Sequence, residues 1–211
     1  MTRKRRGKCS RGSRRALATR QHADSSESRK QLPQTIVFHR GLVGRYIRQL
    51  VRDLRNVFLP NTAANLKVQR SNVLKDFVSV AGPLGVSHFV TLTKTDTAVN
   101  LRIMKLARGP TLTFRVKEYV LARDVVSAIK RPVTYQSQFV HPPLLVMNNI
   151  TRPGSPGTGK NTASDHHLNL VQTMFQNMFP GINVNTVSLD NVRRCLLVDY
   201  NSETNQFHIR H

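Results

Sequence analysis

Two stretches of the chain, residues 88–103 and 194–209, follow one pattern, and this repetition limits the possible folds more than any other feature. In each stretch an alternating apolar segment leads through a short polar turn into a second alternating segment, which predicts a β-hairpin. A short apolar run and a segment with helical spacing precede each hairpin. We therefore expect a twofold duplication of one strand–helix–strand–hairpin unit, because a solenoid would need more copies.

The predicted elements place the chain in the mixed α/β class, with a first half at residues 32–131 and a second half at residues 132–211. In the first half we expect strands at 36–38, 65–68, 88–93, 99–103 and 111–116, and helices at 41–58, 73–80 and 122–130. In the second half we expect strands at 144–147, 182–184, 195–200 and 207–210, and a helix from about Ser164, with Ser164 or Asp165 as its N-cap. The sequence ends on a strand at His211 without a closing signal, so we expect the native protein to continue.

The predicted helix at residues 41–58 has one apolar face and one basic face. Its apolar residues recur at helical spacing: Leu42, Val43, Tyr46, Ile47, Leu50, Val51, Leu54 and Val57. Arg45, Arg48, Arg52 and Arg55 recur at steps of three and four, so they share the other face. A solvated face normally mixes both charge signs, but Asp53 is the only acid here. Because guanidinium groups suit phosphate oxygens, we interpret the row as an RNA contact. The alternatives are a plain solvated face and a contact with an acidic partner protein.

The charge of the whole chain supports a polyanionic partner. Its 211 residues carry a net charge of +22, of which residues 1–30 contribute eleven basic and two acidic residues, a net of +9. The remaining residues keep 22 basic and nine acidic residues, a net of +13, so the charge is not confined to the tail. Residues 1–31 have little apolar content and are predicted to form a disordered basic arm. No apolar run approaches the roughly 18 residues of a membrane span, and the N-terminus is no secretory signal.

No motif in the sequence makes a strong case for catalysis. Residues 154–160 have the spacing of a phosphate-binding loop, and residues 196–199 resemble an apolar strand that ends in a metal-binding Asp199. However, Asn161 stands where a magnesium-binding Ser or Thr belongs, and Asp199 is also explained as the first polar residue of a hairpin turn. His166 and His167 lack further ligands, and the two cysteines are too few for a zinc site. We therefore predict a protein that is not an enzyme and holds no cofactor or metal, with a nucleotide-binding protein that uses Gly154 to Lys160 as the alternative.

Several long motifs resemble the Brix-domain family, and within it the Peter Pan branch of large-subunit assembly factors. They are residues 14–20 (RRALATR), 35–41 (TIVFHRG), 74–86 (LKDFVSVAGPLGV), 109–114 (GPTLTF) and 141–146 (HPPLLV). The resemblance implies two similar halves, each like the anticodon-binding domain of class II tRNA synthetases. The loop at residues 151–163 departs from the branch, because it is longer and rich in glycine, so it looks like an insertion.

The resemblance also implies a nucleolar role without catalysis. Such a protein would bind precursor ribosomal RNA and other assembly factors on the early large-subunit particle, with a direct protein partner on the Brix domain and no membrane. Together with the charge pattern, it predicts RNA contacts from Arg3, Lys4, Arg5, Arg6, Arg14, Arg15, Arg40, Arg45, Arg48, Arg52, Arg55, Lys67, Arg70 and Lys75.

Overall fold

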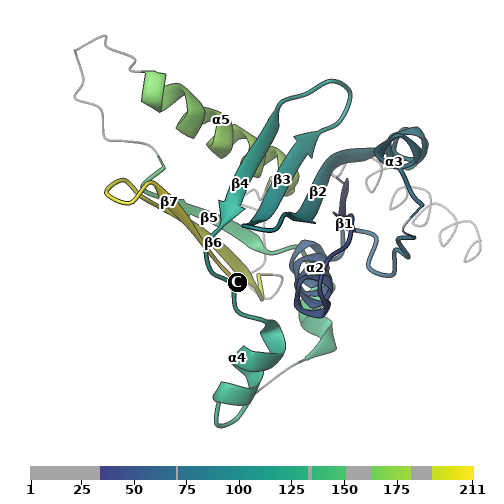
Figure 1. Ribbon diagram of the computed structural model, residues 1–211. Coiled ribbons are helices and arrows are strands. Elements are labelled where there is room, and N and C mark those ends of the chain that lie inside the picture. Colours follow the sequence, from purple (N-terminus) through teal and green to yellow (C-terminus); the bar gives the residue numbers. More distant parts are fainter. Residues whose placement is uncertain (1–33, 70, 133–134, 151–162, 182–191) are drawn as a thin grey trace, which may run out of the picture. The chain divides into compact units, whose positions relative to one another are not determined.

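A computed structural model of the protein describes residues 34–69, 71–132, 135–150, 163–181 and 192–211, all within the compact unit Pro33–His211. The first sheet contains β1 (Gln34–Arg40), β2 (Val86–Lys94), β3 (Val99–Lys105) and β4 (Thr111–Val116), in the order β1-β2-β3-β4 (Figure 1). Strands β1 and β2 are parallel, and the other two pairs are antiparallel.

The second sheet repeats this plan with fewer strands. It contains β5 (Leu144–Asn148), β6 (Cys195–Asn201) and β7 (Gln206–Arg210), in that order. Strand β5 is parallel to β6, and β6 forms an antiparallel hairpin with β7. Each sheet therefore has a parallel pair followed by a hairpin, so the predicted mixed α/β class with two similar sheets is confirmed.

The α-helices agree with the predicted segments, with shifted ends. They are α2 (Arg45–Phe58), α3 (Leu74–Ala81), α4 (Ala122–Ala128) and α5 (Ala163–Met178). The short 3₁₀ helix η1 (Gln136–Phe139) was not predicted. Gly41 has a φ of 80°, a conformation that glycine adopts without strain, and the chain turns here from β1 toward α2. Helix α2 therefore begins at Arg45, later than predicted, and Leu42 lies outside it and is exposed.

Two predicted strands, at residues 65–68 and 182–184, are not found among the described strands. Residues 65–68 do not form a strand, although Leu66 and Val68 still pack against a core. Their apolar alternation reflects this packing and not strand pairing. The predicted strand at 182–184 lies outside the described residues.

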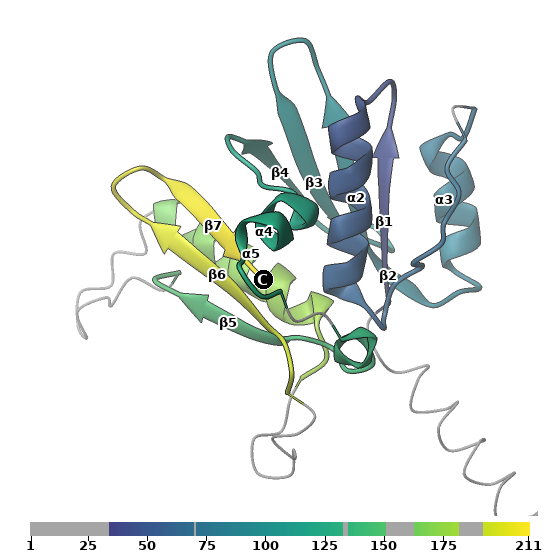
Figure 2. The same cartoon turned by 90° about the horizontal axis from the view of Figure 1, so that it is seen from below.

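Strand β1 separates two hydrophobic clusters, because successive side chains of a strand point to opposite faces. Val37 belongs to the cluster that includes Ile47 and Val51 of α2. Phe38 belongs to the other cluster, where its ring stacks on that of Phe77 of α3 at 4.2 Å between centroids. Figure 2 accordingly shows β1 between α2 and α3. The two helices thus lie on opposite sides of the first sheet.

The larger cluster continues into the second half of the chain. Phe58 of α2 stacks on Phe179, which follows α5, with ring centroids 5.3 Å apart. Phe114 of β4 meets Phe207 of β7 edge to face at 5.5 Å. The two halves therefore share one apolar core, and their contact is fixed by aromatic packing.

Arg194, which precedes β6, adds a polar connection between the halves. Its guanidinium is buried and donates to the backbone oxygens of Asn56 and Leu59 at the end of α2, at 2.9 and 2.6 Å. It also donates to the His141 oxygen at 2.8 Å. A cation at a helix C-terminus satisfies carbonyls that lack partners within the helix. Arg194 therefore caps α2 from the other half of the chain.

Candidate nucleic-acid interface

Helix α2 presents three arginines of the predicted row to solvent. Ile47, Val51 and Phe58 are buried in the core and fix the orientation of the helix. Arg45, Arg48 and Arg52 are exposed on the side away from that core. We call these three residues the α2 row. Their common face follows from the helical period, as the sequence predicted.

Arg55 does not belong to this row, and its prediction as an exposed RNA contact is wrong. The side chain is only 8% exposed. Its Nε donates to the Val37 oxygen at 2.9 Å, and Nη1 donates to the oxygens of Leu66 and Ala64 at 3.0 and 3.3 Å. Burial lowers the pKa of the guanidinium, and the charge of Arg52 acts in the same direction. Arg55 instead holds the segment after α2 against the edge of β1, where the carbonyls need a donor.

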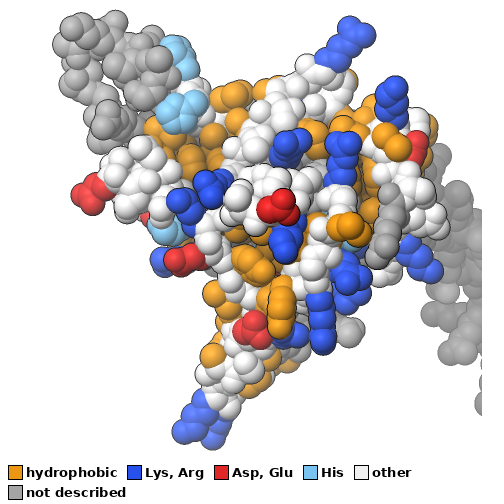
Figure 3. Space-filling view, viewed as in Figure 1, with side chains coloured by type: hydrophobic (Ala, Val, Ile, Leu, Met, Phe, Trp, Pro, Cys, Tyr) orange, Lys and Arg blue, Asp and Glu red, His pale blue; other side chains and the backbone are white. Residues whose placement is uncertain are grey.

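The charges of the α2 row are not neutralised by the neighbouring acid. Asp53 accepts hydrogen bonds from Gln49 Nε2 and from the Ala122 backbone, both at 3.1 Å. The one ion pair between two described residues joins Arg123 to Asp124 at 3.2 Å. Figure 3 shows one face of the molecule, on which Lys and Arg cover more of the surface than Asp and Glu do. An excess of unpaired cations is the electrostatic footprint of a surface that binds polyanions.

The first turn of α2 has an unfavourable charge for helix stability. It holds no acid, although this end of a helix carries partial positive charge and favours acids. Arg45 stands there instead, so the backbone and the side chain both add positive potential. Such a local conflict is expected where a residue serves binding and not stability.

His39 lies beside this surface and is half-buried. Burial lowers its pKa, and the positive charges of Arg48 and Arg55 lower it further, although a backbone hydrogen bond raises it. The lowered pKa favours the neutral imidazole. The charge of the surface comes from guanidinium groups, which stay protonated at any physiological pH.

Helix α4 extends the cationic surface in a way that the sequence did not reveal. The guanidinium of Arg123 lies over the ring of Tyr46, 5.7 Å from its centroid, and both side chains are exposed. Tyr46 was predicted to be in the apolar face of the helix, but its ring is 58% exposed. Only the tertiary contact between α2 and α4 brings Arg123 to the α2 row.

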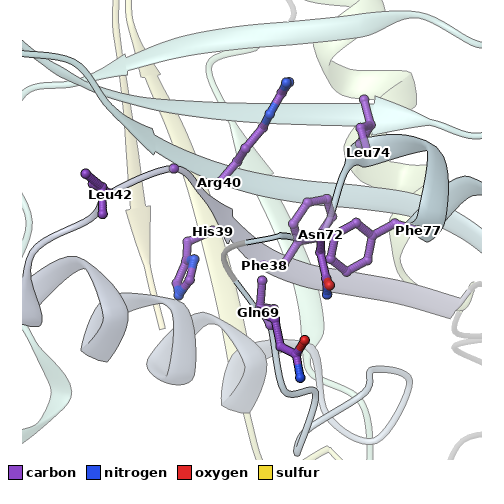
Figure 4. A pocket seen from close by; sticks show the side chains of 10 residues that line it. Phe38, His39, Arg40, Leu42, Gln69, Asn72, Leu74 and Phe77 are labelled. Carbon is purple, nitrogen blue, oxygen red and sulfur yellow. The ribbon is translucent and has the colours of Figure 1, made fainter.

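The other predicted RNA-binding residues do not join the α2 row as one group. Arg40, Lys67 and Lys75 are exposed. In Figure 4 the side chain of His39 points toward α2, and that of Arg40 points the opposite way. Arg70 and the basic arm, with Arg3, Lys4, Arg5, Arg6, Arg14 and Arg15, lie outside the described residues.

Sequence reasoning also missed Arg102 and Arg115, two exposed arginines on β3 and β4. Each stands in an alternating strand at an outward position, which is the available signal in the sequence. The sequence does not, however, give the register that relates one strand to the next.

A pocket of about 180 Å³ lies beside Arg40, between the end of β1 and the chain before α3 (Figure 4). Phe38, Leu74 and Phe77 contribute apolar side chains, and Gln69 and Asn72 contribute amides. It is smaller than the roughly 300–1,000 Å³ of a typical site for a drug-sized ligand. Its size and lining therefore do not favour a bound cofactor.

The alternative chemistry gains no support from the described residues. Asp199 lies within β6 and accepts hydrogen bonds from the side chains of Asn148 and Asn149 at 2.9 and 3.1 Å. The prediction that it begins the hairpin turn is wrong, because β6 continues to Asn201. The loop from Gly154 to Lys160 and the side chains of Ser164 and Asp165 lie outside the described residues. Within the described ranges no three His, Cys, Asp or Glu side chains form a metal-binding group, and no helix is long and apolar enough to cross a membrane.

Comparison with known proteins gives a consistent set of relatives. The family model of the Brix domain matches residues 41–211. "Suppressor of SWI4 1 homolog" of Mus musculus is 49% identical, over 88% of this chain and 37% of its own length. "Protein Peter pan" of Drosophila melanogaster is 42% identical, over 86% of this chain and 37% of its own length. "Ribosome biogenesis protein SSF1" of Saccharomyces cerevisiae is 36% identical, over 91% of this chain and 44% of its own length. The chain thus spans less than half of each of these relatives.

A solved structure supports the fold. The crystal structure of a "probable ribosomal biogenesis protein from Aeropyrum pernix K1" superposes with a TM-score of 0.51 at 12% sequence identity. The match covers 85% of this chain and 89% of that one. At this identity the likeness concerns the fold alone.

Proposed function

Because this chain belongs to the Brix domain family, we propose that it is a ribosome biogenesis factor that binds precursor ribosomal RNA without altering it chemically. It acts on the early precursor of the large subunit, together with other assembly factors. Its place of action is the nucleolus, within the nucleus. The name of the yeast relative, a ribosome biogenesis protein, supports this assignment.

The α2 row is the observation that carries the RNA-binding part of the proposal. Arg45, Arg48 and Arg52 are exposed and make no ion pair with a described acid. Their guanidinium groups offer several donors each, in a geometry that fits phosphate oxygens. Contacts of this kind position a protein on RNA without reading its sequence.

A salt titration with a matched control tests this assignment. The triple variant Arg45→Gln, Arg48→Gln, Arg52→Gln is compared with wild type for binding to a labelled transcript of precursor ribosomal RNA. Each lost phosphate contact reduces the slope of log K against log salt by roughly 0.7–0.9, so we expect a reduction of about 2 to 3. The control variant removes the same charge at three exposed arginines elsewhere: Arg108, Arg131 and Arg210.

The outcome separates a local contact from a general charge effect. We expect the control variant to keep most of the wild-type slope. Equal slopes for wild type and the α2 variant would refute the assignment of these arginines. An equal loss in the control would show that only net charge matters.

The surface of α4 supports the second part of the proposal, a direct protein partner. Val125 and Val126 in the helix and Ile129 directly after it are 47%, 42% and 50% exposed, although their spacing is that of a core-facing stripe. Apolar side chains that remain exposed together are typical of protein contact sites. We expect Val125→Asp with Ile129→Asp to reduce the amount of partner assembly factors that co-purify with the protein, without loss of RNA binding. Unchanged co-purification would place the partner elsewhere.

The absence of catalysis is also open to experiment. Filter binding with labelled ATP should detect no retention beyond that of a Lys160→Ala variant. Retention or hydrolysis that depends on Lys160 would favour the nucleotide-binding alternative.

A further inference from the structure

A second group of arginines lies on the first sheet, on the face away from α2. In the first sheet Arg40 is paired with Thr93, Thr93 with Asn100, and Asn100 with Arg115. We call such a set of directly paired residues, one from each strand, a line. Residues directly paired in neighbouring strands point to the same face. The two outer arginines of this line therefore share a face with each other.

The next line of the register belongs to the same face. It joins Phe38, Thr91, Arg102 and Thr113. Phe38 identifies the face, because it packs in the cluster of α3 and not in that of α2. We call Arg40, Arg102 and Arg115 the sheet-face arginines. They come from β1, β3 and β4, and β1 lies far from the other two in the sequence.

Helix α3 covers only part of this face. The line that contains Ile36, Phe89 and Met104 packs in the α3 cluster, whereas the three sheet-face arginines and Thr113 are exposed. Thr91, between Phe38 and Arg102, is buried. The surface beyond α3 is therefore polar and cationic, formed by guanidinium, hydroxyl and amide groups.

The charge of this surface favours a polyanion. Neither line of paired residues contains an acid, and none of the three arginines makes an ion pair with a described residue. Arg102 and Arg115 are diagonal neighbours, at roughly 7–8 Å. Arg40 and Arg115 are three strand spacings apart, or about 14 Å. This arrangement suits consecutive phosphates of one extended backbone, with the threonine and asparagine side chains available to phosphate or ribose oxygens.

The two cationic surfaces face in opposite directions. The α2 row lies on the outer side of a helix that packs against one face of the sheet, and the sheet-face arginines lie on the other face. A helix about 10 Å thick and the sheet itself separate them. A single short RNA segment reaches one surface or the other.

We propose that the sheet-face arginines bind a second segment of RNA backbone, so that the domain holds two RNA segments on opposite sides of the first sheet. This inference rests on the proposed RNA-binding function. It adds that the protein connects two RNA segments and does not merely coat one.

A bridging assay tests the inference with the full chain. One short hairpin transcript is immobilised, a second is labelled, and the protein is added at a concentration at which it remains monomeric. We expect wild type to retain the labelled RNA on the immobilised one. The variant Arg102→Gln with Arg115→Gln should still bind a single RNA through the α2 row, but bridging should fall to background.

Two comparisons make the assay decisive. The α2 triple variant should also lose bridging and keep single-RNA binding, because it retains the sheet-face arginines. The control Arg131→Gln with Arg210→Gln removes the same charge from other exposed positions and should bridge like wild type. Undiminished bridging by the sheet-face variant, or an equal loss in this control, would overturn the inference. Failure of wild type to bind any RNA would instead reject the proposed function.

Discussion

Substitution by methionine should affect different properties at two arginines that are three residues apart: stability at one and RNA binding at the other. Arg52 and Arg55 both lie on α2, and their sequence contexts are similar. Arg52 is exposed, whereas Arg55 is 8% exposed and donates to three backbone oxygens. We expect Arg55→Met to unfold the protein more easily without removing an RNA contact. We expect Arg52→Met to weaken RNA binding without changing stability.

The magnitude follows from the hydrogen bonds of Arg55. The bonds to Val37 and Leu66, at 2.9 and 3.0 Å, are well formed, and the one to Ala64 at 3.3 Å is longer. A hydrogen bond to a charged group contributes about 1.5–3 kcal/mol. Methionine keeps much of the apolar stem but leaves these carbonyls without their donor, so we expect a loss of about 3–4 kcal/mol. For a domain of this size that corresponds to a melting temperature lower by roughly 6–16 °C.

Two measurements on each variant complete the experiment. Urea unfolding gives the free energy of unfolding, and a salt titration at low temperature gives the slope for RNA binding by the folded protein. Arg52→Met should stay within about 0.5 kcal/mol of wild type and lower the slope by roughly 0.7–0.9. The reasoning fails if Arg55→Met is as stable as Arg52→Met, or if it lowers the salt slope as much.

Two further predictions concern stability. Arg194→Met removes the donor that caps α2 from the second half, so this variant should lose about 3–5 kcal/mol of unfolding free energy in urea. The same change at the exposed Arg210 should cost under about 1 kcal/mol, and equal effects would show that the cap is unimportant. Burial, assisted by the charge of Lys105, lowers the pKa of His88 from 6.5 to about 4, so the unfolded chain takes up a proton at a higher pH than the folded protein does. The free energy of unfolding should therefore fall by up to about 3 kcal/mol between pH 6.5 and pH 4, and a His88→Leu variant should show a clearly weaker pH dependence; an unchanged one would contradict this account.

The environment of His88 explains the direction of its pKa shift. The Ser87 hydroxyl donates its one hydrogen to the Gln34 oxygen at 3.0 Å, so at the 2.8 Å contact His88 Nδ1 is the donor to Ser87 Oγ. Nε2 is then the unprotonated nitrogen, and it is buried without a partner among the described residues. Protonation would place a charged N–H there with no acceptor, which is costly.

Most element types could be predicted from the sequence because they depend on neighbours along the chain. The alternation of 88–93 and 99–103 predicted a hairpin, and the period of Ile47, Val51 and Leu54 predicted a helix, as the structure has them. The same alternation wrongly predicted a strand at residues 65–68. There the apolar alternation arises from packing against a core and not from pairing with another strand.

The amino-acid sequence by itself determined that α2 would be amphipathic, that its charge would be cationic, and that the hairpin plan would occur twice, since charge and periodicity are local properties. Only the tertiary structure decided which arginines are available to a ligand. Arg55 and Arg194 donate instead to backbone carbonyls of other segments of the chain. Their shortest hydrogen bonds measure 2.9 Å for Arg55 and 2.6 Å for Arg194. The sheet-face arginines become neighbours only through strand register, because contacts between distant segments depend on how the whole chain packs.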